Sequence, residues 1–327
     1  MTKSHHNSGT DADTNGDTPM DPFLSLLDSS HAVDKDQWLV PVDHGSSIDR
    51  SGSPADDGIL MAYEKMAPFC AYLEPWKLHD PTTQVYYLVN RVKAFTSDVA
   101  ERNSTPFMHA RLYTDHTPPC ILDCFATNVL YTNRNPRNIA TVMQALYRNV
   151  RALIGTEAGR VIVTPAEKLA CTQALFLYQV IRLFDGDVTL RAQGEHDIPL
   201  LRTWLGDLCR VRENLGDIAK LGGNAVKAQP PKEWKRWIFA ESVRRTIVMA
   251  YSVLTLYGMM KYDADTWEYT HRWTLSRHLW EADSSSTFYR MWSEKPHFII
   301  SNFSFEDFLE HGRGDDVDEF AVILLNG

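Results

Sequence analysis

The sequence has few cysteines, and none lies near its start. The five thiols are Cys70, Cys120, Cys124, Cys171 and Cys209. An odd number of thiols spread along a chain of 327 residues is not the pattern of a secreted disulfide framework. Cys120 and Cys124 are close in sequence, but no second pair follows at a zinc-ligand spacing. We therefore expect ordinary buried thiols and no metal site.

Excess positive charge and long apolar runs are also missing. Lys and Arg number 33 against 42 Asp and Glu, and no basic stripe marks a surface that would neutralise DNA phosphates. No run approaches the roughly 18 apolar residues that cross a bilayer, and the polar N-terminus lacks the apolar core of a signal peptide. We expect a soluble intracellular protein with weak or no direct DNA binding and no membrane association.

The common catalytic signatures are absent as well. The glycines of residues 155–160 form neither a dinucleotide fingerprint nor a phosphate-binding loop, and we expect a turn there. No Gly-x-Ser-x-Gly elbow and no His-Glu-x-x-His zinc motif occurs. His271 and His278 would share a helix face only if a helix already ran at His271. The sequence therefore favours a protein that is not an enzyme, with no catalytic residue, no cofactor and no metal.

What the sequence does contain is acid, and it lies at one end. Residues 1–57 hold eleven carboxylates and three cations, a formal charge of −8, which leaves −1 for the other 270 residues of a chain whose net charge is −9. This stretch is rich in Asp, Ser, Gly, Asn and Thr and has almost no apolar periodicity. Such a composition cannot offset the entropy of ordering the backbone. We predict a disordered acidic tail over residues 1–57 and a folded domain over residues 58–327.

Two short apolar islands interrupt the tail, and the second surrounds Trp38, Leu39 and Val40. Phe23, Leu24 and Leu27 stand among carboxylates, and acidic segments with a few bulky apolar residues can fold as short helices into a partner's groove. Phe23, Leu24 and Leu27 are therefore candidate partner-binding residues of an activation segment. The alternative is a solvated leader whose apolar residues are incidental.

From about Ile59 onward the apolar residues recur at helical spacing. Residues 164–167, Thr-Pro-Ala-Glu, form a capping-box signature ahead of one helix, and Asp185 and Gly186 end it. Asp197 resembles the N-cap of a later helix that runs to about Leu215. The remaining helices are expected over residues 82–102, 120–131, 136–154, 234–260, 273–281, 284–294, 304–311 and 316–325.

The expected helix 234–260 has large apolar residues on more than one face, so we place it in the middle of the fold. No series of alternating strand patterns is visible. The prediction is an all-α fold with one large helical domain.

Three charged residues lie in the part of that helix where large apolar and charged residues are most concentrated, residues 234–246. Glu241 precedes Arg244 and Arg245 by three and four positions, the spacings at which a carboxylate and a guanidinium pair on one helix face. A general base requires a pKa near the working pH, and two arginines would hold the pKa of Glu241 too low. We interpret the three residues as a structural brace.

The run WIFAESVRRT, residues 237–246, carries a family resemblance. Together with VIRLFDGDVTLRAQGEHDIPLLRTW before it and LWEADSSSTFYRMWSEKPHFIISNFSFEDFL and DDVDEFAVILLNG after it, the run resembles the C-terminal helical region of fungal binuclear zinc cluster transcription factors. The resemblance covers roughly residues 60–327. It implies an all-α regulatory domain whose central helix carries Trp-Ile, Glu-Ser and Arg-Arg-Thr.

The sequence departs from that family at its start. Family members that bind DNA hold two zinc ions with six cysteines near the N-terminus, whereas no cysteine precedes Cys70 here and Lys3 is the only cation of the first thirty residues. The family's zinc ligands and DNA-contacting lysines have no counterparts in this sequence. Either the protein lacks the cluster, or the gene model has lost the exon that encodes it.

Three functional hypotheses follow. The first is a nuclear transcription regulator, with the cytoplasm as a second location, that works through other transcription proteins or a DNA-binding partner. It would control a metabolic gene cluster, a secondary metabolic one as with many such fungal regulators, and would respond to a small-molecule effector. The second is an enzyme or small-molecule binder of fungal secondary metabolism on the same helical scaffold. The third is an interaction scaffold.

Overall fold

The computed structural model describes residues 73–158, 163–214, 230–261 and 271–326. All of them belong to one unit of the chain, residues 52–327. The predicted acidic tail lies outside the described residues, so its disorder and its boundary at residue 57 stay predictions.

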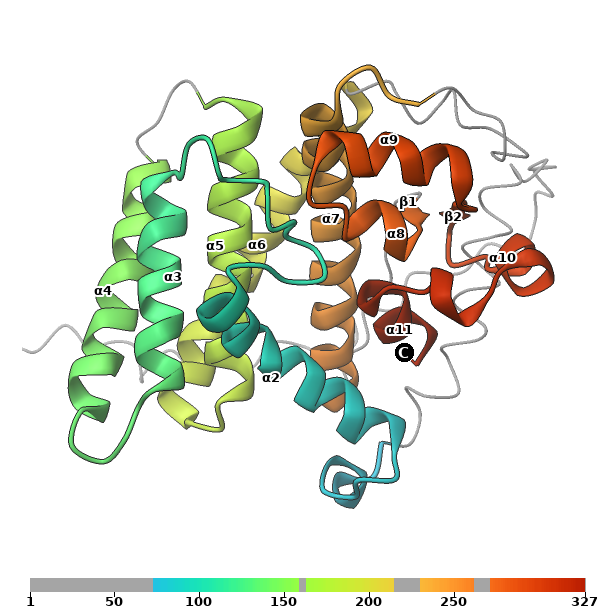
Figure 1. Ribbon diagram of the computed structural model, residues 1–327. Helices are drawn as coiled ribbons and strands as arrows, with labels where there is room; N and C mark the ends of the chain where they lie inside the picture. Colours follow the sequence, from blue (N-terminus) through green and yellow to red (C-terminus); the bar gives the residue numbers. More distant parts are fainter. Residues whose placement is uncertain (1–72, 159–162, 215–229, 262–270, 327) are drawn as a thin grey trace, which may run out of the picture. The chain divides into compact units, whose positions relative to one another are not determined.

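Within the described residues the regular secondary structure is helical apart from two short strands, which confirms the all-α class (Figure 1). The helices and strands, in chain order, are η2 (Pro75–Leu78), α2 (Gln84–Arg102), α3 (Pro119–Thr132), α4 (Ile139–Ala158), α5 (Pro165–Phe184), α6 (Val188–Asn214), α7 (Trp234–Met260), β1 (Arg272–Leu275), α8 (Arg277–Trp280), α9 (Ser285–Glu294), β2 (Phe298–Ser301), α10 (Glu306–His311), η4 (Gly314–Asp316) and α11 (Glu319–Leu325).

The predicted start and end of α5 are confirmed. The Thr164 side chain accepts a hydrogen bond from the backbone N–H of Glu167, and the Glu167 carboxylate accepts one from the backbone N–H of Thr164. The helix stops at Phe184, and Gly186 adopts a φ of +105°, a conformation that side chains disfavour. Local hydrogen bonding therefore sets both ends of this helix.

The prediction for Asp197 is wrong. Helix α6 begins at Val188, where the Asp187 side chain accepts a hydrogen bond from the Leu190 backbone N–H at 2.8 Å. Asp197 lies well inside the helix and pairs with the buried Arg182 of α5 at 2.7 Å. Asp197, which resembles a helix N-cap in the sequence, is thus the ion-pair partner of an arginine on the neighbouring helix.

Two further local predictions are corrected. Helix α4 runs to Ala158, so residues 155–158 are helical where a turn was expected. The expected helix over residues 273–281 begins as strand β1, which pairs antiparallel with β2, Trp273 opposite Ile300. The partner strand is remote in sequence, and this pairing supplies the backbone hydrogen bonds that a helix would otherwise make internally.

The central position predicted for α7 is confirmed. Most of its residues from Trp237 to Tyr257 are buried, and it contacts α5, α6 and β1. Helix α5 is equally buried, because every residue from Leu169 to Phe184 is shielded from solvent. It contacts α2, α3, α4, α6 and α7. The two helices together form the core of the described domain.

Candidate functional site

Helix α7 carries a charged cluster in the interior of the domain. The Glu241 carboxylate accepts hydrogen bonds from Arg244 at 2.6 Å and from Arg245 at 3.0 Å. It also accepts the backbone N–H of Thr274 in β1 at 2.9 Å. The exposed fraction is 0% for Glu241 and Arg245 and 4% for Arg244. All three residues proposed from the sequence thus meet, and they also hold a strand.

Arg245 links four parts of the chain. Besides Glu241, its guanidinium donates to the carbonyl of Thr274 at 2.9 Å and to the Asp318 carboxylate at 2.5 Å. A longer bond of 3.3 Å reaches the carbonyl of Pro106, in the segment between α2 and α3. One cation therefore ties α7 to β1, to that segment and to the residue before α11.

Aromatic rings enclose the same guanidinium. Its carbon lies 3.9 Å from the ring centroid of Trp280 and 4.8 Å from that of Phe320. Trp273 stands farther away, at 5.7 Å. Ring faces attract a cation, and the attraction strengthens where water is excluded. Arg245 is consequently held by both charge and aromatic stacking.

The network is balanced in charge, because Glu241 and Asp318 offset Arg244 and Arg245. Burial by itself would raise the pKa of Glu241, but the two neighbouring guanidinium groups and the Thr274 N–H outweigh it and lower that pKa. Glu241 is therefore ionised at neutral pH. A carboxylate in this state is poorly suited to abstract protons, which fits a positioning role.

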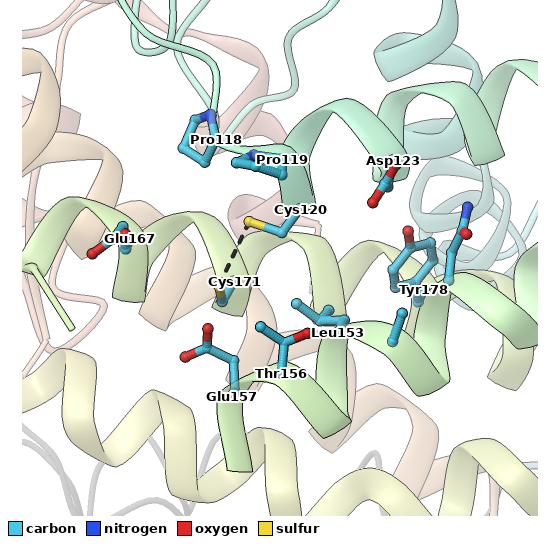
Figure 2. Close-up of a pocket in the computed structure, with 12 residues that line it drawn as sticks. Pro118, Pro119, Cys120, Asp123, Leu153, Thr156, Glu157, Glu167, Cys171 and Tyr178 are labelled. Carbon is cyan, nitrogen blue, oxygen red and sulfur yellow. Dashed lines mark hydrogen bonds between the residues drawn. The ribbon is translucent and has the colours of Figure 1, made fainter. Parts of the chain in front are cut away.

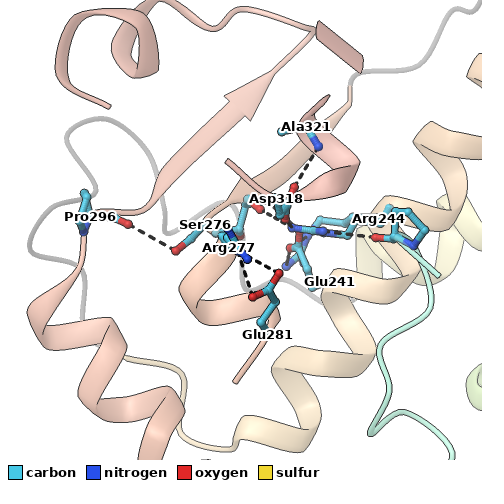
Figure 3. A network of polar contacts seen from close by, with 11 residues as sticks. Glu241, Arg244, Ser276, Arg277, Glu281, Pro296, Asp318 and Ala321 are labelled. Carbon is cyan, nitrogen blue, oxygen red and sulfur yellow. Dashed lines mark hydrogen bonds and ion pairs between the residues drawn. The ribbon is translucent and has the colours of Figure 1, made fainter. Parts of the chain in front are cut away.

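Asp318 is the member of this network that the sequence prediction missed. One of its carboxylate oxygens accepts the backbone N–H of Ala321 at 2.9 Å and so caps α11 (Figure 3). The other oxygen pairs with Arg245. Asp318 stands three residues before Ala321 and just ahead of an apolar run, which is an N-cap signature. That signature predicts the cap, but nothing local predicts the arginine.

A cavity of about 490 Å³ lies beside the network. Its wall includes residues of the segment after α2, of α8 and the residues that follow it, and of the start of α11. Its lining residues include His109, Ala110, Arg111, Trp280, Glu281, Asp318 and Phe320. A volume of this size is within the range of small-molecule sites in proteins.

The polar groups in the cavity wall are mostly engaged. Nδ1 of His109 accepts the backbone N–H of Arg111 at 2.9 Å, and burial together with Arg245 lowers the pKa of His109 to about 4. Glu281 pairs with Arg277 at 3.1 Å, and Asp318 is bound as described. Nε2 of His109 is buried and has no hydrogen-bond partner among the described residues. The cavity therefore brings a histidine and carboxylates together, with Asp318, Glu281 and one nitrogen of His109 held in structural bonds.

The other predicted positions fall elsewhere. Phe23, Leu24 and Leu27 lie outside the described residues. Cys124 bonds to the carbonyl of Ala174 instead of facing a metal. Within the described residues no three His, Cys, Asp or Glu side chains are grouped as metal ligands, and no helix combines the length and apolar composition needed to cross a bilayer.

His271 and His278 do not share a helix. His271 precedes β1, whereas His278 lies in α8.

Comparison with known proteins gives one informative similarity. The chain is similar to Transcription factor gsfR2 from Penicillium aethiopicum. The two are 27% identical over 250 residues, which is 75% of this chain and 60% of that protein. The chain thus spans less than two thirds of the length of this relative. No family model and no solved structure matches. The similarity supports the expected relationship to fungal transcription factors.

Proposed function

We propose that the protein is a transcription regulator of the fungal zinc cluster family that acts without a zinc cluster of its own. The observation that carries the proposal is the similarity to Transcription factor gsfR2 over 250 residues. The helical fold, and the central helix that bears the WIFAESVRRT run, agree with a regulatory domain of that family.

In this proposal another protein reads the DNA. A six-cysteine cluster cannot be built from five cysteines, and none of the five precedes Cys70. The 270 residues after the tail have a formal charge of only −1, so the domain offers little net attraction to phosphates. A DNA-binding partner would bring the regulator to a secondary metabolic gene cluster in the nucleus.

The acidic tail supplies the contact with the transcription machinery. Phe23, Leu24 and Leu27 give this segment a small apolar face among carboxylates. A segment of this kind binds when its apolar residues enter a groove and its charge steers the encounter.

The cavity beside Arg245 supports a second element of the function, an effector site. The indole of Trp280 in its wall would cover the apolar part of a small molecule. Because burial lowers the pKa of His109 to about 4 and makes it a weak base at neutral pH, and because Asp318 is already paired with Arg245, binding is favoured over catalysis. Phe320 and Asp318 also border the network, so an occupied cavity would bias the position of α11.

Activation by the tail is tested with the full chain fused to a heterologous DNA-binding module and a reporter gene. The unchanged fusion is expected to activate, and a variant with Phe23→Ala, Leu24→Ala and Leu27→Ala is expected to lose most of that activity. The matched control carries Trp38→Ala and Leu39→Ala in the second apolar island of the tail, and it is expected to keep its activity. A silent unchanged fusion would contradict the proposed activation segment.

Direct DNA binding is tested separately with the purified full chain and promoter DNA. We expect no mobility shift near physiological salt. A shift by the protein alone, weakening steeply as salt is raised, would show that the chain reads DNA itself.

The effector site is tested by native mass spectrometry of the full chain purified from a filamentous fungus. The unchanged protein is expected to retain a small molecule. Ala110→Trp, at the rim of the cavity, should lose that molecule, whereas Ala152→Trp at a different cavity should keep it. The absence of any bound molecule from the unchanged protein, or equal retention by both variants, counts against this site.

A further inference from the structure

A second cavity, of about 400 Å³, contains a pair of thiols that the proposed function does not use. Cys120 lies in the first turn of α3 and Cys171 lies in α5, 51 positions later. Their sulfur atoms are 3.5 Å apart, and the Cys171 thiol donates a hydrogen bond to the Cys120 sulfur. Figure 2 shows the two side chains pointing toward each other at the cavity, with Glu157 of α4 beside Cys171.

The two thiols differ in access and in charge preference. Cys120 is partly exposed, whereas Cys171 is 4% exposed. The hydrogen bond from Cys171 and the backbone N–H of Ile121 lower the pKa of Cys120, although burial and Glu157 oppose them. The same hydrogen bond, burial and Glu157 raise the pKa of Cys171. Cys120 is therefore the nucleophile of the pair, and the less exposed Cys171 is the resolving cysteine.

We propose that Cys120 and Cys171 form a reversible disulfide when the protein meets a hydroperoxide. The sulfur atoms must approach from 3.5 Å to the bonded distance of about 2.05 Å, a movement that small rotations of two side chains can supply. The cavity admits the oxidant, because hydrogen peroxide is little larger than the water molecules that such cavities hold. This proposal is independent of the proposed function.

The chemistry takes two balanced steps. The Cys120 thiolate attacks one oxygen of hydrogen peroxide, the S–O bond forms as the O–O bond breaks, and the departing hydroxide takes up the proton that Cys120 released, giving water. Cys171 then attacks the sulfenic sulfur of Cys120, the S–S bond forms as the S–O bond breaks, and the hydroxyl leaves with the Cys171 proton as a second water. Two thiols lose two electrons, and one peroxide is reduced to two waters.

The remaining described thiols are built-in controls. Cys124 and Cys209 are 1% and 2% exposed, and burial raises the pKa of both. The Cys124 thiol donates to the carbonyl of Ala174 at 3.8 Å, and Cys209 packs among apolar side chains that include Leu169 and Val243. Intracellular disulfides are uncommon and are chiefly catalytic or redox-sensing, so selective oxidation of one pair would mark a sensor.

The test is peptide mapping of the full chain after titration with hydrogen peroxide and alkylation of the remaining thiols. We expect a linked pair of peptides that joins Cys120 to Cys171, lost alkylation at both positions in parallel, and recovery of both with a dithiol reductant. Cys124 and Cys209 should remain alkylated. Cys120 and Cys124 lie in the same tryptic peptide, so fragment ions are needed to show which of the two is bonded to Cys171.

Two variants separate the roles. Cys171→Ser should leave a sulfenic acid on Cys120 that a dimedone probe traps, and Cys120→Ser should leave Cys171 reduced; circular dichroism checks that each variant retains its helices. The proposal is overturned if Cys120 and Cys171 stay as reduced as Cys209 at every peroxide concentration. It is equally overturned if Cys120 bonds to another cysteine, or if Cys171 oxidises without Cys120.

Discussion

Arg245 and Asp318 are 73 positions apart in the sequence, and their side chains meet at 2.5 Å in the interior of the domain. The same carboxylate caps α11, so one residue fixes both the start of that helix and its attachment to α7. The position of the last helix therefore depends on a cation in the middle of the central helix.

Arg245→Met should be strongly destabilising. The substitution keeps the apolar stem but leaves Glu241 with one guanidinium fewer and Asp318 without its ion pair, and breaking a buried ion pair in this way costs about 3–5 kcal/mol. Urea denaturation followed by circular dichroism measures the loss. The matched control is Arg277→Met, which breaks an exposed pair with Glu281 and should cost at most about 1 kcal/mol. Equal effects of the two substitutions would show that the network is no brace.

Asp197→Ser separates a cap from an ion pair. Serine caps helices about as well as aspartate does, so a capping Asp197 would tolerate the change. Because Asp197 instead neutralises Arg182, which is 3% exposed, we expect a loss of about 2–3 kcal/mol. Asp187→Ser, at the residue that does cap α6, should be nearly neutral. Chemical denaturation of both variants checks the order, and the reverse order would contradict the assignment.

Gly194→Ala tests the close approach of α5 and α6. An added Cβ would lie 2.9 Å from the Leu183 side chain and 3.1 Å from Cβ of Arg182, and such overpacking costs about 1–3 kcal/mol. Gly206→Ala in the same helix meets nothing within 4 Å. It should stabilise the protein by up to about 1 kcal/mol, because alanine favours helix more than glycine does. Thermal denaturation compares the pair, and stabilisation by both changes would refute the close contact.

The buried histidines predict a loss of stability in mild acid. Burial, with a contribution from Arg245, lowers the pKa of His109 to about 4, and burial together with Arg212 lowers that of His271 to about 3. The unfolded chain takes up these protons near pH 6.5, whereas the folded chain does not. The stabilising effect is thus complete above pH 6.5 and declines as the pH falls through 6.5 toward 4, by about 1.4 kcal/mol per pH unit for each histidine.

Urea denaturation at several pH values between 7 and 4.5 measures that slope. His109→Gln should reduce the slope of the unfolding free energy against pH by up to about 1.4 kcal/mol per pH unit, the contribution of one proton. His311→Gln, at an exposed position, should leave the slope unchanged. The pKa of Glu241 is also lowered, so its contribution to stability has the same sign: it is present above about pH 4.5 and is lost as the pH falls below that value. Between pH 7 and 4.5 the slope therefore comes from the histidines, and Glu241 adds to it only in stronger acid. A slope that His109→Gln does not change would contradict the burial of a neutral imidazole.

Local sequence patterns were enough to predict the helical class, most helix boundaries and the pairs of residues that meet within one helical turn. Thr164 with Glu167, and Glu241 with Arg244 and Arg245, are three or four positions apart, so helix geometry brings them together in any context. The burial of α7 followed from apolar residues on more than one of its faces.

Contacts between residues far apart in the sequence became visible only in the folded domain. Asp318 contacts Arg245 although 73 positions separate them, and Cys171 contacts Cys120 although 51 positions separate them. Asp197, which resembles a helix cap in the sequence, instead forms an ion pair with Arg182. Strand β1 likewise forms because β2, whose residues lie 23 to 29 positions farther along the chain, is packed beside it. Local signals act through backbone geometry within one turn, whereas these contacts exist because the packing of whole helices sets where each side chain ends.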